Sequence, residues 1–98
     1  VDYAKALAYA LKAYNSDLHK RSTASLNLGI VYFANERYHK AITYLKMSDV
    51  NKEPYLALWL GLAYASKDQS AMAKYYFNIA IKAGVEIPQE VTDYMYSN

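Results

Sequence analysis

The sequence of residues 25–34, SLNLGIVYFA, returns 32 positions later, at residues 57–66, as ALWLGLAYAS. Both stretches contain Leu-Gly-x-x-Tyr, with the glycine inside a largely apolar run. A glycine within a helix costs about 1 kcal/mol relative to alanine, so two glycines at matching places indicate a packing requirement. The same shift relates three further pairs: Ala41 with Ala73, Leu45 with Phe77, and Ser48 with Ala80. The chain therefore contains an internal repeat, which decides its fold.

Helix-forming residues and helical spacing of apolar side chains occupy most of the chain, with short polar breaks between them. Six helices are predicted: over residues 2–14, from a Ser22 or Thr23 cap to near Asn35, through 38–45, from Pro54 through 64, through 72–81, and from Pro88 onward. With three glycines and two prolines the chain has too few turn residues for an all-β fold. The fold class expected is all-α.

Composition bounds the class of protein. The chain has 98 residues, of which 54% are hydrophobic and 20% charged, as in a single globular domain. Its formal net charge of +2 is too small to predict a nucleic-acid partner. No apolar run approaches the roughly 20 residues that a membrane span needs, so membrane insertion is not expected. Cysteine is absent, which excludes disulfides and cysteine-ligated zinc.

A search for catalytic groups finds little. The two histidines, His19 and His39, have no helical spacing and no carboxylate cluster that would make a metal site. The hydroxyl residues Ser22, Thr23 and Ser25 lack a His–Asp arrangement, and the three glycines form no phosphate-binding loop. We therefore predict no catalytic residues, no metal site and no cofactor, and we expect that the chain is not an enzyme.

With two helices in each period, the repeat resembles the tetratricopeptide repeat (TPR), whose pattern is W-x2-L-G-x2-Y followed by Ala and an aromatic residue over 34 residues. Here the period is 32, and Ser25 and Ala57 stand where the family has Trp. The resemblance implies a right-handed α-solenoid of antiparallel helix pairs, about six helices in one domain over residues 1–98. Its parts would be a half repeat at 1–16, full repeats at 22–53 and 54–87, and a capping helix at 88–97.

Two classes of residue follow from this arrangement. Small residues let paired helices approach closely, and larger ones fill the space between neighbouring pairs. The residues assigned to this repeat packing are Leu28, Gly29, Tyr32, Ala41, Leu60, Gly61, Tyr64, Ala73 and Phe77. The first helix of each pair would line a concave face, and its residues here are Thr23, Leu26, Ile30, Phe33, Tyr55, Leu58, Leu62 and Ala65.

That face would be a mainly apolar groove, and contiguous exposed apolar surface is typical of protein-binding sites. The function expected is a protein–protein interaction module, or scaffold, that binds a peptide or helix of a partner protein. The alternative is a structural solenoid segment of a larger protein, used for self-association or packed internally. A clamp for a peptide's terminal carboxylate, known in this family, is not expected, because Tyr55 and Trp59 stand where basic residues would be needed.

Overall fold

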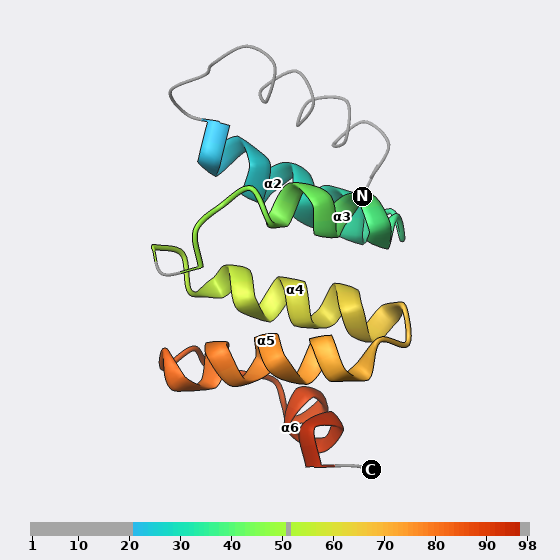
Figure 1. Cartoon of the computed structure of the whole chain (residues 1–98), viewed down its shortest axis with the longest axis vertical. Coiled ribbons are helices and arrows are strands. Elements are labelled where there is room, and N and C mark those ends of the chain that lie inside the picture. Colours follow the sequence, from blue (N-terminus) through green and yellow to red (C-terminus); the bar gives the residue numbers. More distant parts are fainter. Residues whose placement is uncertain (1–20, 51, 97–98) are drawn as a thin grey trace. The chain divides into compact units, whose positions relative to one another are not determined.

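The computed structural model describes residues 21–50 and 52–96, with side chains from residue 25 onward. This part of the chain forms five helices and contains no strand (Figure 1). They are α2 (Arg21–Ala34), α3 (Tyr38–Leu45), α4 (Tyr55–Ser66), α5 (Ser70–Lys82) and α6 (Gln89–Tyr96). The all-α prediction is confirmed for these residues. The helix predicted over 2–14, and the half repeat at 1–16, lie outside them.

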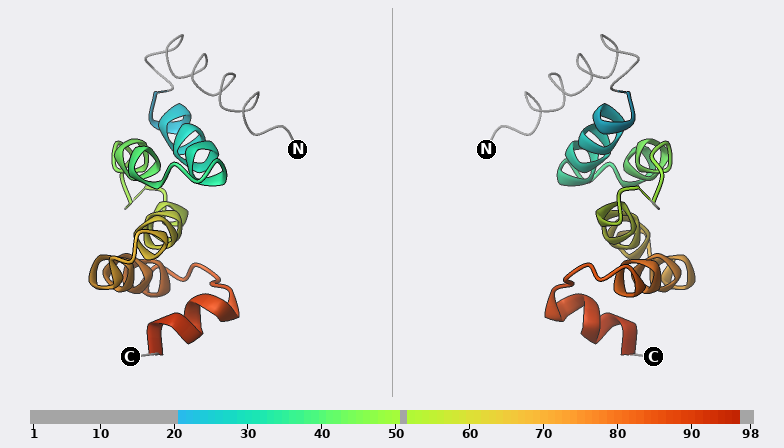
Figure 2. Two further views of the ribbon diagram at one scale, coloured as in Figure 1. Left: turned by 90° about the vertical axis from the view of Figure 1, so that its right-hand side faces the viewer. Right: turned by 90° about the vertical axis from the view of Figure 1, so that its left-hand side faces the viewer.

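The chain divides into two compact units, Val1–Asp49 and Val50–Asn98. In the first unit α2 and α3 form an antiparallel hairpin; in the second, α4 and α5 form another hairpin, which α6 follows (Figure 2). The unit boundary falls within the loop that the sequence predicts between the two repeats. The expectation of one domain over residues 1–98 stays a prediction.

Both hairpins turn in the same way. The residue two places after each first helix has a left-handed backbone, with φ of 62° at Glu36 and 59° at Asp68. The next N–H then reaches back to the last helical turn: Arg37 donates to the Tyr32 carbonyl at 2.9 Å, and Gln69 donates to the Tyr64 carbonyl at 3.0 Å. This is the Schellman termination, here made without glycine. It satisfies carbonyls that would otherwise have no partner at the helix end.

Gly29 and Gly61 lie where the two helices of their hairpins are in close contact. A Cβ placed on Gly29 would lie 2.6 Å from Leu45 Cγ, and one placed on Gly61 would overlap the ring of Phe77. Leu45 and Phe77 are themselves almost wholly buried. The remaining residues assigned to repeat packing are buried too: Leu28, Tyr32, Ala41, Leu60, Tyr64 and Ala73. Each hairpin thus has its own core, built on a matching glycine contact.

A tyrosine pair adds to each hairpin. Tyr32 and Tyr44 stack with ring centroids 5.4 Å apart and planes 17° from parallel. Tyr64 and Tyr76, each 32 positions later, stack at 5.6 Å and 5°. Offset stacking of this kind is favourable beyond the area that the rings bury. The repeat found in the sequence therefore extends to side-chain geometry.

The last helix packs against α5 within the second unit. Gly84, with φ of 82°, ends α5, and the Val85 N–H donates to the Ala80 carbonyl at 3.0 Å. In Figures 1 and 2 α6 then crosses α5 at a steep angle. Val91 is buried, and the Tyr94 ring meets Phe77 edge-on with centroids 5.9 Å apart. Phe77 therefore contacts α6 as well as lying against Gly61.

Candidate functional site

The helix α4 has no charged side chain in its 12 residues, YLALWLGLAYAS. Its packing side carries six buried residues: Leu56, Ala57, Leu60, Gly61, Ala63 and Tyr64. A helix that is apolar on all sides is ordinarily covered on all sides. The other side of α4, however, remains partly open.

The open side of α4 consists mainly of residues that the sequence assigned to a groove. Tyr55, Leu58, Leu62 and Ala65 recur at helical spacing and therefore share one stripe. Tyr55 is 60% exposed, and the other three are half-buried. Trp59 is also half-buried and lies beside this stripe. We call Tyr55, Leu58, Leu62 and Ala65 the α4 stripe.

In the first unit, α2 carries the corresponding stripe. Leu26, Ile30 and Phe33 are spaced by four and three residues, and all three are half-buried. Phe33 meets Tyr38, at the start of α3, edge-on with ring centroids 5.4 Å apart. We call Leu26, Ile30 and Phe33 the α2 stripe. Thr23, predicted to extend it, lies in α2 with its side chain outside the described residues.

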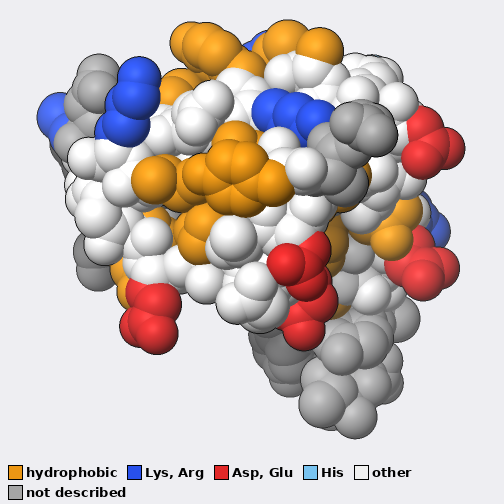
Figure 3. Space-filling model, turned by 90° about the horizontal axis from the view of Figure 1, so that it is seen from below, with side chains coloured by type: hydrophobic (Ala, Val, Ile, Leu, Met, Phe, Trp, Pro, Cys, Tyr) orange, Lys and Arg blue, Asp and Glu red, His pale blue; other side chains and the backbone are white. Residues whose placement is uncertain are grey.

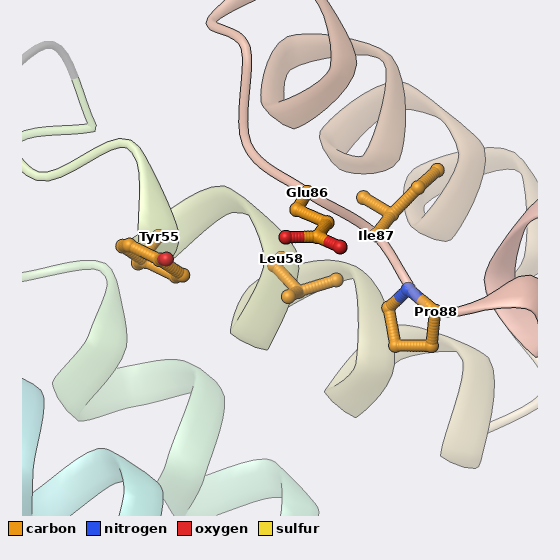
Figure 4. A pocket seen from close by; sticks show the side chains of 5 residues that line it. All are labelled: Tyr55, Leu58, Glu86, Ile87 and Pro88. Atoms are coloured by element: carbon orange, nitrogen blue, oxygen red, sulfur yellow. The ribbon is translucent and has the colours of Figure 1, made fainter.

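A pocket of about 320 Å³ opens beside the first turn of α4 in the second unit. Tyr55 and Leu58 of the α4 stripe line it, together with Glu86, Ile87 and Pro88 from the connection between α5 and α6 (Figure 4). In Figure 4 the Glu86 carboxylate lies over Leu58, between Tyr55 and Pro88. The pocket therefore combines an aromatic ring, three apolar walls and one carboxylate.

Three of these five residues are not predicted from the sequence as part of a site. Glu86, Ile87 and Pro88 follow the end of α5, and the sequence indicates Pro88 only as the start of the last helix. The one sequence signal that could have indicated them is the short connection between α5 and α6. Gly84 ends one helix and Pro88 precedes the next, so the residues between them must pass close to the hairpin.

The surface seen from the α6 end bears hydrophobic side chains grouped near its centre, with Asp and Glu side chains beside them (Figure 3). Several large hydrophobic residues of the second unit are well exposed besides Tyr55: Met72, Tyr75 and Ile81 of α5, and Tyr96 of α6. Tyr75 packs edge-on against Tyr76, which belongs to the hairpin stack. Apolar exposure in the second unit is thus not confined to α4.

Groups for catalysis or metal binding are scarce in the described part of the chain. Within residues 21–50 and 52–96 no cluster of three or more His, Asp or Glu side chains could hold a metal ion. His39 is exposed on α3, and His19 lies outside the described residues. Among the described helices none is long and apolar enough to cross a bilayer.

Comparison of the chain with models of known protein families, with curated proteins and with solved structures gave no match.

Proposed function

We propose that this chain is a TPR-like interaction module that binds a segment of a partner protein on the stripes of α2 and α4. The observation that carries the proposal is the α4 stripe, an uncharged and partly open surface opposite the face that packs on α5. Open apolar surface of this kind is typical of sites that another molecule covers. The function is binding, and the proposal includes no reaction.

The repetition of one hairpin supports a solenoid arrangement. The two hairpins share a glycine contact, a stacked tyrosine pair and a Schellman turn, each displaced by 32 residues. Repeated helix pairs of this length stack on their neighbours in α-solenoids, and the first helices then line one concave face. We therefore propose that each stripe is the partner-binding side of the first helix of its repeat, with α6 as the capping helix.

The chemistry of the stripes indicates what would bind. Leucine, isoleucine and phenylalanine side chains favour Leu- or Phe-type anchors, presented by a helix or by an extended peptide. Aromatic residues dominate the energetics of interfaces, so Phe33 and Tyr55 are the expected centres of affinity. A Phe33→Ala substitution alone should then weaken binding more than Ala65→Ser.

A second function fits the same helix. A helix without charges on any side is typical of one buried within a larger assembly. The chain would then be a structural solenoid segment whose α4 stripe pairs with a second copy or with further repeats. Self-association would leave no groove for a separate peptide.

The proposal is tested with a random 12-residue peptide library displayed on phage and selected on the 98-residue chain. Selected peptides are synthesised, their affinities measured by fluorescence anisotropy, and their sites mapped by amide chemical-shift changes. We expect the largest shifts at the α2 and α4 stripes, and at least a tenfold loss of affinity in the double variant Phe33→Ala with Leu62→Ser.

The matched control is Met72→Ala with Tyr75→Ala, which removes exposed apolar side chains from α5 instead. Circular dichroism checks that both double variants fold. Failure to select any peptide, or shifts confined to α5 with full affinity in the α2–α4 variant, would contradict the proposed function.

A further inference from the structure

The pocket beside α4 differs from the stripe that it continues, because it contains a charge. Leu58, Ile87 and Pro88 provide apolar walls, Tyr55 provides an aromatic face, and Glu86 provides a carboxylate. Figure 4 shows the Glu86 carboxylate at the pocket, among these side chains, rather than directed away from them. All five residues belong to the second unit.

Two of the five residues have unused binding capacity. Glu86 is exposed and makes no hydrogen bond or ion pair with any residue in the described ranges 21–50 and 52–96. The Tyr55 ring is 60% exposed and makes no ring contact within those ranges. By contrast, the carboxylate of Asp93 in α6 already accepts a hydrogen bond of 2.9 Å from Gln89 Nε2.

The chemistry of the pocket lining favours some kinds of ligand side chain over others. A purely apolar anchor would cover the Glu86 carboxylate and remove its water without providing a donor, which is unfavourable. A carboxylate or phosphate would be repelled. A lysine or arginine fits all three components: its methylene stem packs on the apolar walls, while its charged head reaches both the carboxylate and the tyrosine face.

The surrounding charge agrees with this choice. With Glu86, three exposed carboxylates lie in or beside the lining segments in the sequence, the others being Glu53 and Glu90, against two ammonium groups at Lys52 and Lys82. The volume of about 320 Å³ is at the small end of the range for ligand pockets, which suits a side chain better than a cofactor.

We propose that this pocket recognises a lysine or arginine side chain of the partner peptide, next to the apolar anchors held by the α4 stripe. The inference rests on the proposed function and deepens it. The partner segment is expected to be apolar and basic, with its cationic residue seated between Tyr55 and Glu86. Glu86 would select the partner by charge, while the stripe provides most of the affinity.

A structural role for Glu86 is the competing explanation. The pocket lies at the N-terminus of α4, where the helix dipole favours a negative charge. If Glu86 served only this purpose, its neutralisation would lower the melting temperature and leave peptide affinity unchanged. The two roles therefore separate in one pair of measurements.

The test uses the same phage-selected 12-residue peptides, with the sequenced pool compared against the unselected library. We expect enrichment of Lys or Arg beside Leu or Phe. Glu86→Gln should weaken the selected basic peptides roughly threefold to fivefold, the upper part of the range of an exposed ion pair. Raising NaCl from about 50 mM to about 500 mM should weaken binding to the wild-type chain but have little effect on the variant.

The matched control is Asp68→Asn, which removes one exposed carboxylate from the same unit at the opposite end of α4. Asparagine tolerates the left-handed backbone there, so this variant should fold and bind like the wild type. A third variant, Tyr55→Leu, keeps the wall apolar but removes the aromatic face. It should weaken basic peptides more than apolar ones, because both lose the contact area of the ring but only the basic ones also lose its contact with the cation.

Four results would overturn the inference. One is a selected pool without enriched Lys or Arg, and another is an equal loss of affinity in Asp68→Asn. The other two are unchanged affinity in Glu86→Gln, either with the melting temperature also unchanged or with a lower melting temperature, which would indicate the structural role. If peptides bind and depend on Phe33 and Leu62, any of these leaves the proposed function standing. If the library yields no binder, both proposals fail together.

Discussion

At the scale of single residues, a missing side chain sets how closely two helices approach. Gly29 and Gly61 lie against Leu45 and Phe77 with no room for a Cβ. In an exposed helix the replacement of glycine by alanine is stabilising, because alanine has the higher helix propensity. In these hairpins the contact across the helices opposes that gain, and the two neighbours oppose it differently. At Gly29 the neighbours are the Leu45 side chain and, at 3.2 Å, the Leu45 backbone nitrogen, whereas at Gly61 the neighbour is the Phe77 ring, which also contacts Tyr94 of α6.

We expect Gly61→Ala to destabilise the second unit by about 1–3 kcal/mol, the usual cost of overpacking a core. The reason is that the added Cβ overlaps the Phe77 ring, which is buried and also packs edge-on against Tyr94. Urea unfolding followed by circular dichroism measures the change. As a control, the same substitution should cost less in a Phe77→Leu background. A Gly61→Ala variant as stable as the wild type would contradict the close-packing explanation.

At the scale of helices, each hairpin depends on a tyrosine stack as well as on its glycine contact. Tyr64 is buried and Tyr76 is half-buried, and their rings are nearly parallel. The Leu-Gly-x-x-Tyr repeat assigns Tyr32 and Tyr64 to the packing set, but it does not indicate Tyr44 and Tyr76. Which ring on the second helix meets the first depends on how the two helices are rotated, and only their packing decides that.

A double-mutant cycle tests this stack. We expect Tyr64→Leu and Tyr76→Leu to show a coupling free energy of about 0.5–1.5 kcal/mol, as aromatic pairs do. The control cycle combines Tyr64→Leu with Tyr96→Leu, whose side chain is 81% exposed on α6. That pair should be additive, since residues without a shared contact rarely couple. Additivity of the Tyr64 and Tyr76 changes would show that the stack contributes no stability of its own.

At the scale of the whole molecule, the open stripes could be covered either by a partner protein or by a second copy of the chain. Partner binding and self-association make different demands on the free chain. A groove reserved for a partner must be open in the monomer, whereas a self-associating segment pairs through the uncharged α4 face. The proposed binding function therefore requires that the chain does not use this face for a second copy.

We expect the 98-residue chain to be a monomer at all concentrations from about 1 µM to about 200 µM, a range in which moderate self-association becomes visible. Light scattering coupled to size-exclusion chromatography makes the measurement. A stable dimer that Leu62→Ser dissociates would instead support the structural-segment alternative. A dimer that survives this substitution would place self-association elsewhere on the surface.

The features that depend on local spacing can be predicted from the sequence alone. The helices, the stop at Gly84 and the 32-residue repeat all follow from periodicity and from single turn residues. The sequence also indicates the side of α2 and of α4 that carries the two stripes, because it is the side without the assigned packing residues. It could not show that Glu36 and Asp68, rather than glycines, adopt the left-handed backbone of the hairpin turns. The backbone hydrogen bonds that hold those turns, from Arg37 to Tyr32 and from Gln69 to Tyr64, are likewise seen only in the structure.

The pocket and its chemistry depend on how segments far apart in the sequence pack together. Tyr55 and Leu58 begin α4, while Glu86, Ile87 and Pro88 belong to a connection one whole helix later in the chain. No spacing rule joins these residues, because α5 and the path of its following loop must first pack against α4. The charge of the pocket comes from that loop. Thus local periodicity predicts an apolar stripe, and the return of the chain after α5 places a carboxylate at its end.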